Sequence, residues 1–130
     1  MSTEELIRGT WAALAGGDLG ALESVLAPEA RWRAVEDGPW NCENRAAIID
    51  VMGRNLSRGL PGEVEEVIDL CGRAIVAFRP SAARGEQAWP LDDGIRYVVL
   101  TLHDGLVVEM KGCPDRAAAF AYAEAADSRR

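Results

Sequence analysis

The sequence has few of the residues that build disulfide frameworks, metal sites or membrane spans. Its 130 residues include three cysteines, one histidine and no apolar run long enough to cross a bilayer. Cys42, Cys71 and Cys113 form no Cys-x-x-Cys pair, which predicts reduced thiols in a cytoplasmic protein. A single histidine completes no zinc set, and no Gly-rich phosphate loop follows a predicted strand. We therefore expect no metal and no cofactor.

Positive charge is also scarce. Fourteen Lys and Arg residues stand against 21 Asp and Glu residues, which gives a net charge of −7 and a pI near 4.7. A surface this acidic repels nucleic-acid phosphates and anionic lipid head groups, so we expect no nucleic acid and no membrane as partners. The N-terminal segment is acidic as well, unlike a secretory signal, and this favours a cytoplasmic location.

The length and the apolar content are typical of one folded domain. Apolar residues make up 48% of the chain and charged residues 27%, which is a globular composition. A single core commonly takes about 100–150 residues, and no repeat or change of composition divides the chain. We expect one domain over residues 1–130.

The spacing of apolar residues changes from helical to alternating after Gly62, which predicts an α+β fold. Capping residues and helical spacing predict helices from Ser2 or Thr3 to Gly16, over 19–26 and over 44–57. Alternation predicts strands over 31–35, 64–70, 74–78, 95–103 and 106–113. A last helix is expected from Pro114, with Ala117, Phe120 and Ala121 on its inner side.

Asp104-Gly105 lies between the two strongest predicted strands and is typical of a two-residue type I′ turn. Such a turn fixes the pairing of the strands. The residues expected on one face, toward the core or a cavity, are His103, Thr101, Val99 and Tyr97 opposite Leu106, Val108, Met110 and Gly112. The apolar residues expected on the other face are Val98, Leu100, Leu102 and Val107. An exposed apolar patch of this kind predicts a homodimer.

Several short motifs follow one another over nearly the whole chain. They are Gly16-Gly17-Asp18, Leu26-Ala27-Pro28 before the Trp32 strand, Asn44-Arg45-Ala46-Ala47-Ile48, the hairpin from His103 to Met110, and Pro114-Asp115-Arg116-Ala117. In this order they resemble the nuclear transport factor 2-like superfamily, and in particular its SnoaL-like polyketide cyclase branch. The resemblance implies a curved antiparallel sheet wrapped around three to four helices as a cone-shaped α+β barrel. It also implies an open pocket at the wide end and often a homodimer through the outer sheet.

The resemblance further implies a class of chemistry. Superfamily enzymes include isomerases, cyclases and dehydratases that act on compact apolar substrates with carboxylates or histidines inside the cone. Cyclase-like members often carry an Asp two residues after the position of Met110, where this chain has Gly112. The general base that the resemblance would supply is therefore missing from this position.

Three residues are candidate catalytic groups. His103 titrates near neutral pH, although solvated polar residues are also ordinary beside a tight turn. Tyr97 could donate its hydroxyl to a substrate carbonyl or to a structural partner. Asp37 could share a proton with Glu36 at the predicted rim, although turn chemistry alone also explains Asp37-Gly38-Pro39.

The predicted ligand site lies on the inner faces of separate elements. Its expected lining is Trp32, Trp40, Met52, Tyr97, Val99 and Met110. Gly112 removes a side chain from the same wall and should enlarge the cavity. A lining of aromatic and methionine side chains fits a flat, mostly apolar small molecule.

Three functions stay open at this point. The protein is an acid–base enzyme of the cyclase, isomerase or dehydratase type, a non-catalytic protein that holds an apolar ligand, or a dimerisation module of the same fold. A carboxylate or histidine beside the pocket would favour the enzyme.

Overall fold

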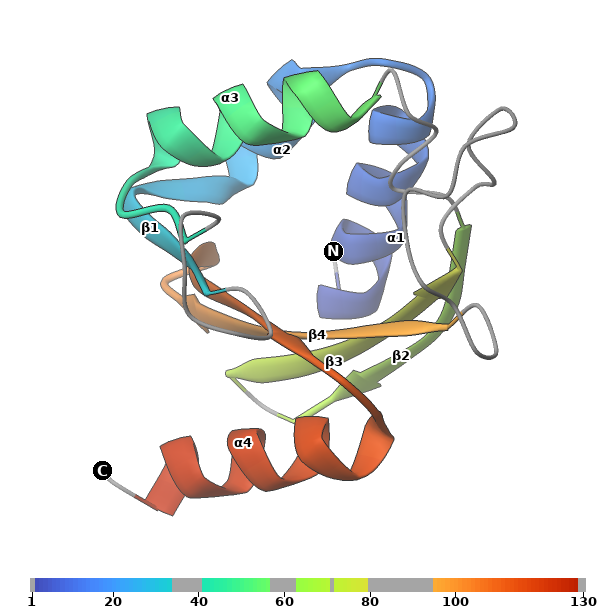
Figure 1. The fold of residues 1–130 in the computed structure, drawn as a ribbon, viewed down its shortest axis with the longest axis vertical. Coiled ribbons are helices and arrows are strands. Elements are labelled where there is room, and N and C mark those ends of the chain that lie inside the picture. Colours follow the sequence, from blue (N-terminus) through green and yellow to red (C-terminus); the bar gives the residue numbers. More distant parts are fainter. Residues whose placement is uncertain (1, 34–40, 57–62, 71, 80–94, 129–130) are drawn as a thin grey trace.

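The computed structural model of the chain has an α+β fold (Figure 1). It describes residues 2–33, 41–56, 63–70, 72–79 and 95–128. The elements are α1 (Thr3–Ala15), α2 (Leu19–Val25), β1 (Leu26–Arg33), α3 (Arg45–Leu56), β2 (Glu63–Asp69), β3 (Arg73–Arg79), β4 (Arg96–His103), β5 (Leu106–Cys113) and α4 (Arg116–Ser128). The fold class and the order of the elements confirm the sequence prediction. No helix in these ranges is both long and apolar enough to span a membrane.

Polar side chains cap the helices at the positions that the sequence suggests. The Ser2 hydroxyl accepts a hydrogen bond from the Glu5 amide at 3.1 Å, and the Glu5 carboxylate accepts one from the Ser2 amide at 2.9 Å. Asp18, Asn44 and Asp115 cap α2, α3 and α4 in the same way, each accepting from the amide three residues later. Each cap contributes about 1 kcal/mol, so these short polar residues fix where the helices begin.

The five described strands form one open sheet in the order β1-β5-β4-β3-β2. Neighbouring strands are antiparallel except for β1 and β5, which run parallel. The sheet is therefore mixed, and the expectation of a purely antiparallel sheet is wrong for this pair. β1 also begins at Leu26, five residues earlier than predicted, and includes Pro28. A proline is tolerated there because β1 is an edge strand and its pairing is irregular between Leu26 and Arg31.

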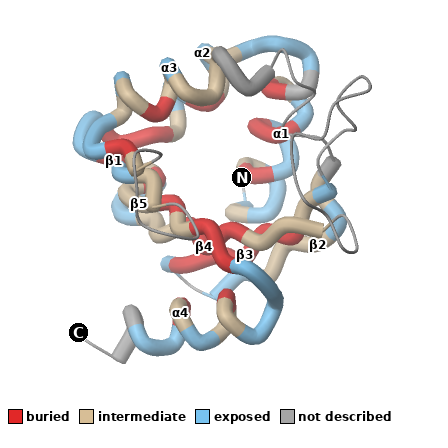
Figure 2. Tube along the Cα trace, in the orientation of Figure 1, coloured by how far each residue is buried: buried red, intermediate tan, exposed pale blue. Residues whose placement is uncertain are grey.

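Helices lie on both faces of the sheet. α1, α2 and α3 lie on one face, called the concave face here, and α4 packs on the opposite, convex face (Figures 1 and 2). The larger hydrophobic cluster is on the concave face and includes Trp11, Leu14, Val76, Val98, Leu100 and Met110. The smaller cluster lies under α4 and consists of Ile75, Val99, Cys113, Ala119 and Ala123 with their partly buried neighbours.

The inner side of α4 differs from the expected one. Ala119 and Ala123 are buried, whereas Ala117 and Ala121 are exposed and Phe120 is half-buried. α4 is also joined to the sheet by an ion pair between Arg116 and Glu66. This hydrogen-bonded ion pair raises the pKa of Arg116 and joins the first turn of the helix to β2.

The β4–β5 hairpin contains a β-bulge that the sequence pattern does not indicate. Its turn is as predicted, with positive φ angles of 54° at Asp104 and 80° at Gly105. His103 pairs with Leu106 and Leu102 with Val107, but the next pair is Thr101 with Glu109, so Val108 is skipped. From this point the register is shifted by one residue, which exchanges the two faces of the strand.

The bulge overturns the predicted face assignment. Val98 and Leu100 pair with Gly112 and Met110 and belong to the concave side, where Val98, Leu100 and Met110 are core residues. The expected outer patch of Val98, Leu100, Leu102 and Val107 is thus part of the larger cluster or packs against it. The homodimer was predicted from the exposure of this patch, and the structure does not show that exposure. The homodimer therefore stays a prediction.

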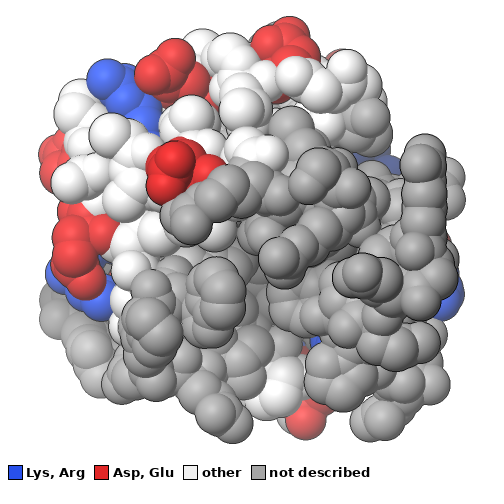
Figure 3. All heavy atoms as spheres, turned by 45° about the horizontal axis from the view of Figure 1, so that its top comes forward, with Lys and Arg blue, Asp and Glu red and all other residues white. Residues whose placement is uncertain are grey.

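The charge of the surface agrees with the composition. On the face drawn in Figure 3, acidic side chains are spread among uncharged ones, and few basic side chains lie between them. This face includes the side of the molecule formed by α2 and α3.

Candidate functional site

The concave face carries an aromatic pair between α1 and β3. Trp11 is only 6% exposed and packs against Phe78, with ring centroids 5.3 Å apart and ring planes inclined by 50°. The indole Nε1–H of Trp11 is buried and has no hydrogen-bond acceptor among the described residues. A buried donor without an acceptor costs about 1–3 kcal/mol, so a ligand atom that accepts here would be favoured.

Three of the six predicted ligand-binding residues lie on the same side of the sheet. Met110 is buried in the larger cluster, and Trp32 and Met52 are half-buried against it. Two backbone hydrogen bonds of 2.9 Å between Trp32 and Cys42 hold the end of β1 against the segment that leads into α3. β1 and α3 thus bring Trp32 and Met52 to one cluster with Met110.

Two of the other three predicted residues, Tyr97 and Val99, are not on this wall. Tyr97 and Val99 belong to the cluster under α4, on the convex side, because of the β-bulge at Val108. The prediction that they share a face with Met110 is wrong. Trp40 lies outside the described residues. The role of these residues in ligand binding stays a prediction.

Of the three candidate catalytic residues, the structure describes His103 and Tyr97, which lie near opposite ends of β4. The His103 side chain is 77% exposed at the hairpin turn, and its Nε2 lies 3.4 Å from the Asp104 carboxylate. Tyr97 is on the convex side, and Asp37 and Glu36 lie outside the described residues. Among the residues whose burial the structure describes, Thr10 and Arg73 are the buried polar or charged ones, and no carboxylate or histidine is buried. Within those ranges, no group of three or more metal-ligating side chains is placed to hold an ion.

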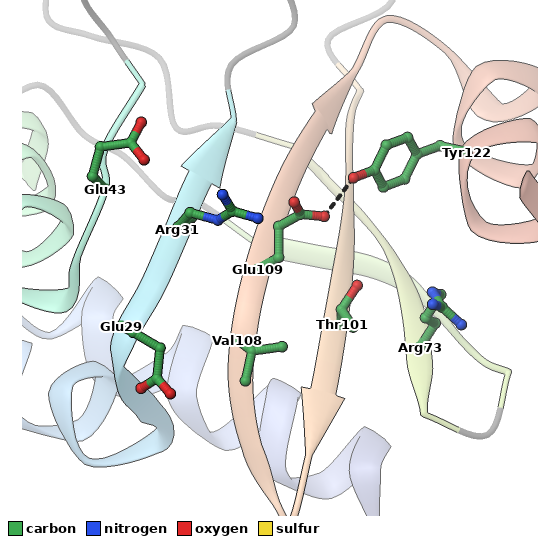
Figure 4. Close-up of a pocket in the computed structure, with 8 residues that line it drawn as sticks. All are labelled: Glu29, Arg31, Glu43, Arg73, Thr101, Val108, Glu109 and Tyr122. Atoms are coloured by element: carbon green, nitrogen blue, oxygen red, sulfur yellow. Dashed lines mark hydrogen bonds between the residues drawn. The ribbon is translucent and has the colours of Figure 1, made fainter. Parts of the chain in front are cut away.

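A second region of interest is a groove on the convex face beside α4 (Figure 4). Its volume is about 670 Å³, and it is lined by Glu29, Arg31, Glu43, Arg73, Thr101, Val108, Glu109 and Tyr122. The Tyr122 hydroxyl of α4 donates a hydrogen bond to the Glu109 carboxylate of β5. Arg33 donates to Glu43 at 2.9 Å at the outer side of the groove.

Four of these residues form a row across four neighbouring strands. Arg31 pairs with Glu109 across β1 and β5, Glu109 with Thr101 across β5 and β4, and Thr101 with Arg73 across β4 and β3. Residues paired in this way lie on the same face of a sheet, about 5 Å apart. Sequence reasoning missed this row because the predicted register placed Glu109 and Thr101 on opposite faces.

Comparison with known proteins shows the fold. Neither a protein-family model nor a curated protein matches the chain. A proposed polyketide cyclase from Sinorhizobium meliloti aligns with a TM-score of 0.66 and 17% identity, over 83% of this chain and 93% of that chain. A nuclear transport factor 2-like protein of unknown function from Burkholderia pseudomallei aligns with a TM-score of 0.67 and 21% identity, over 90% of this chain and 94% of that chain.

A de novo designed protein with a curved β-sheet is similar to the same degree. Its TM-score is 0.67 at 14% identity, over 95% of this chain and 96% of the designed chain. Because one scaffold is shared by a designed protein and by natural ones, function has to be argued from the side chains. The structure nevertheless confirms the architecture that the sequence resemblance implies. The chain has the fold of the nuclear transport factor 2-like proteins.

Proposed function

We propose that this protein binds a flat, mostly apolar small molecule on the concave side of its sheet. The observation that carries the proposal is the Trp11 indole N–H, which is buried without an acceptor among the described residues. Phe78 lies against the ring, and Met110, Met52 and Trp32 belong to the hydrophobic cluster that contains Trp11 or pack against it. A planar ligand with one acceptor oxygen, such as an aromatic ketone, satisfies that donor and buries its rings among these side chains.

The size of the expected affinity follows from the buried area. About 200 Å² of apolar ligand surface at about 25 cal/mol per Å² contributes on the order of 5 kcal/mol before the cost of association. One hydrogen bond to the indole adds about 0.5–1.5 kcal/mol. We therefore expect micromolar or weaker binding of simple aromatic probes.

Binding without catalysis is the form of the proposal that the described residues support. A general base has to reach the proton that it removes, and no carboxylate or histidine is buried among the residues whose burial the structure describes. The similar fold of a proposed polyketide cyclase keeps an acid–base enzyme of the cyclase, isomerase or dehydratase type as the second candidate. That enzyme would depend on residues such as Asp37, which lie outside the described ranges.

A pair of matched ligands tests the proposal. Acetylnaphthalene and ethylnaphthalene have nearly the same shape, but only the ketone can accept a hydrogen bond. Calorimetric titration of the parent and of Trp11→Phe with both ligands forms a thermodynamic cycle. We expect Trp11→Phe to weaken the ketone about three- to tenfold and to leave the hydrocarbon within about twofold, because it removes one hydrogen bond and keeps an aromatic ring.

Gly112→Leu provides the blocking control. Gly112 is buried and paired with Val98, so the new side chain enters the concave side. The variant should weaken both ligands, while circular dichroism verifies that it is folded. If neither ligand binds the parent, or if folded Gly112→Leu binds both as well as the parent does, the proposal is wrong.

A further inference from the structure

The groove on the convex face is separate from the concave site, since the sheet lies between them. Its volume of about 670 Å³ is in the range of small-molecule sites, which is about 300–1,000 Å³. The row across its floor contains both signs of charge. In order, its groups are the Arg31 guanidinium, the Glu109 carboxylate, the Thr101 hydroxyl and the Arg73 guanidinium. Solubility requires charged side chains on the surface, but it does not require opposite charges and a hydroxyl in one row along a groove.

The two neighbouring charges at the β1 end of the row, Arg31 and Glu109, point toward one another without pairing. Figure 4 shows the Arg31 guanidinium and the Glu109 carboxylate directed at each other across the gap between β1 and β5. No ion pair joins them, and Arg31 makes no hydrogen bond or ion pair with any residue in the described ranges. Tyr122 donates to one oxygen of Glu109, which fixes the carboxylate on the groove floor.

The rest of the lining adds charges of both signs. Glu29 is exposed on the same strand as Arg31, and Arg73, which is only 7% exposed, ends the row on the far side of Thr101. A doubly charged phosphate would meet the carboxylates of Glu29 and Glu109. A simple cation would meet two guanidinium groups. A ligand that carries both charges meets a partner for each of them.

We propose that the groove binds a small zwitterion of the α-amino acid class. Its carboxylate accepts two hydrogen bonds from the Arg31 guanidinium, a geometry that arginine offers and lysine does not. Its ammonium group donates to Glu109, and Thr101 supplies a hydroxyl on the neighbouring strand. The ligand thus completes the interaction that Arg31 and Glu109 do not make directly, and its side chain extends over Val108.

The test is an amide NMR titration of the whole chain with each common L-amino acid in turn. We expect at least one of them to give saturable shifts of the Thr101, Val108 and Glu109 amides. The amide of that amino acid, which lacks the carboxylate, and its N-acetyl form, which lacks the ammonium group, should each bind at least about tenfold more weakly, as loss of a charge-assisted hydrogen bond predicts.

Variants distinguish this groove from the rest of the surface. Arg31→Gln and Glu109→Gln should each weaken binding by about tenfold or more. Arg8→Gln is the matched control, because Arg8 is an exposed arginine on α1 that pairs with Glu4 and lies outside the groove. Trp11→Phe should leave amino acid binding unchanged, which separates this proposal from that of the concave site.

Several results would overturn the proposal. One is that no amino acid shifts the groove amides, and another is that folded Arg31→Gln binds as well as the parent. If inorganic phosphate or the N-acetyl form binds as tightly as the amino acid, the groove is an anion site and the zwitterion is excluded. Sedimentation at the same concentration shows whether a second copy covers this face, and a dimer closed over the groove would also contradict the proposal.

Discussion

The two faces of the sheet use the same strands for different purposes. On the concave face, β4 and β5 present Val98, Leu100 and Met110 to helices α1–α3, and these residues belong to one hydrophobic cluster with Trp11. On the convex face, the same strands present Thr101 and Glu109 to an open groove. The difference shows that alternation along a strand defines two sets of side chains without deciding which set becomes the core.

A single inserted residue sets which side chains of β5 share a face with each set of β4 side chains. Val108 is skipped in the pairing of β4 with β5, and every pair beyond it is shifted by one position. Without the bulge, Met110 would lie opposite Val99 and Glu109 would lie on the face opposite Thr101. The bulge therefore pairs Met110 with Leu100 on the concave face and Glu109 with Thr101 on the convex face.

The largest expected effect separates a core face from an exposed one. Leu100 is 3% exposed on the concave side, so Leu100→Ala should lower the free energy of unfolding by about 2–5 kcal/mol through lost burial and an unfilled cavity. Urea unfolding measures the change. Leu70, at 37% exposed, is the control, and Leu70→Ala should stay within about 0.5 kcal/mol. A cost below about 0.5 kcal/mol for Leu100→Ala would restore the idea of an outer patch.

Deletion of Val108 tests the bulge itself. If Val108 is the inserted residue, its removal leaves Thr101 paired with Glu109 and Leu100 paired with Met110. We expect a folded protein that loses about 1–2 kcal/mol of stability, because the strand keeps its faces and loses local curvature and packing. Circular dichroism and urea unfolding are the measurements.

Deletion of Lys111 is the matched control for this experiment. It removes one residue of the same strand beyond the bulge, so Gly112 and Cys113 would exchange faces. Its cost should exceed that of the Val108 deletion. Equal costs, or a Val108 deletion that does not fold, would contradict the assignment of the bulge.

The smallest expected effect concerns the buried thiol on the convex side. Burial under α4 raises the pKa of Cys113, so the unfolded chain releases this proton at a lower pH than the folded protein does. The stability that Cys113 contributes is complete below the thiol pKa of the unfolded chain, about 8.5, and is lost as the pH rises through the higher folded value. Urea unfolding from pH 7 to pH 10 should show a steeper fall for the parent than for Cys113→Ala. Parallel curves would mean that Cys113 is not shielded by α4.

Local features of the chain allowed much of the fold to be predicted. These features depend only on residues that are close together in the sequence. They are the caps at Ser2, Asp18 and Asn44, the turn at Asp104-Gly105 and the change of period after Gly62. These signals are enough to place helices and strands in the right order. Trp32, Met52 and Met110 were also correctly assigned to the inner side of their elements.

The features that could not be predicted from the sequence depend on contacts between distant segments of the chain. The parallel pairing of β1 with β5, the bulge at Val108 and the approach of Tyr122 to Glu109 all depend on tertiary packing. The registers with and without a one-residue shift fit the alternating pattern of β4 and β5 almost equally well, because each predicted face of the hairpin contains several Val and Leu residues. The charged row and the placement of Tyr97 could not be obtained from periodicity for this reason.

The central claim is that the concave side binds an apolar ligand through Trp11, and the indole proton of Trp11 tests it most directly. Its NMR resonance is the indole signal that Trp11→Phe removes. Titration with acetylnaphthalene should move this resonance downfield, and ethylnaphthalene should move it much less, with the Thr101 and Glu109 amides on the convex face unchanged. If the ketone leaves the Trp11 indole resonance in place, or moves only the convex amides, the claim is wrong.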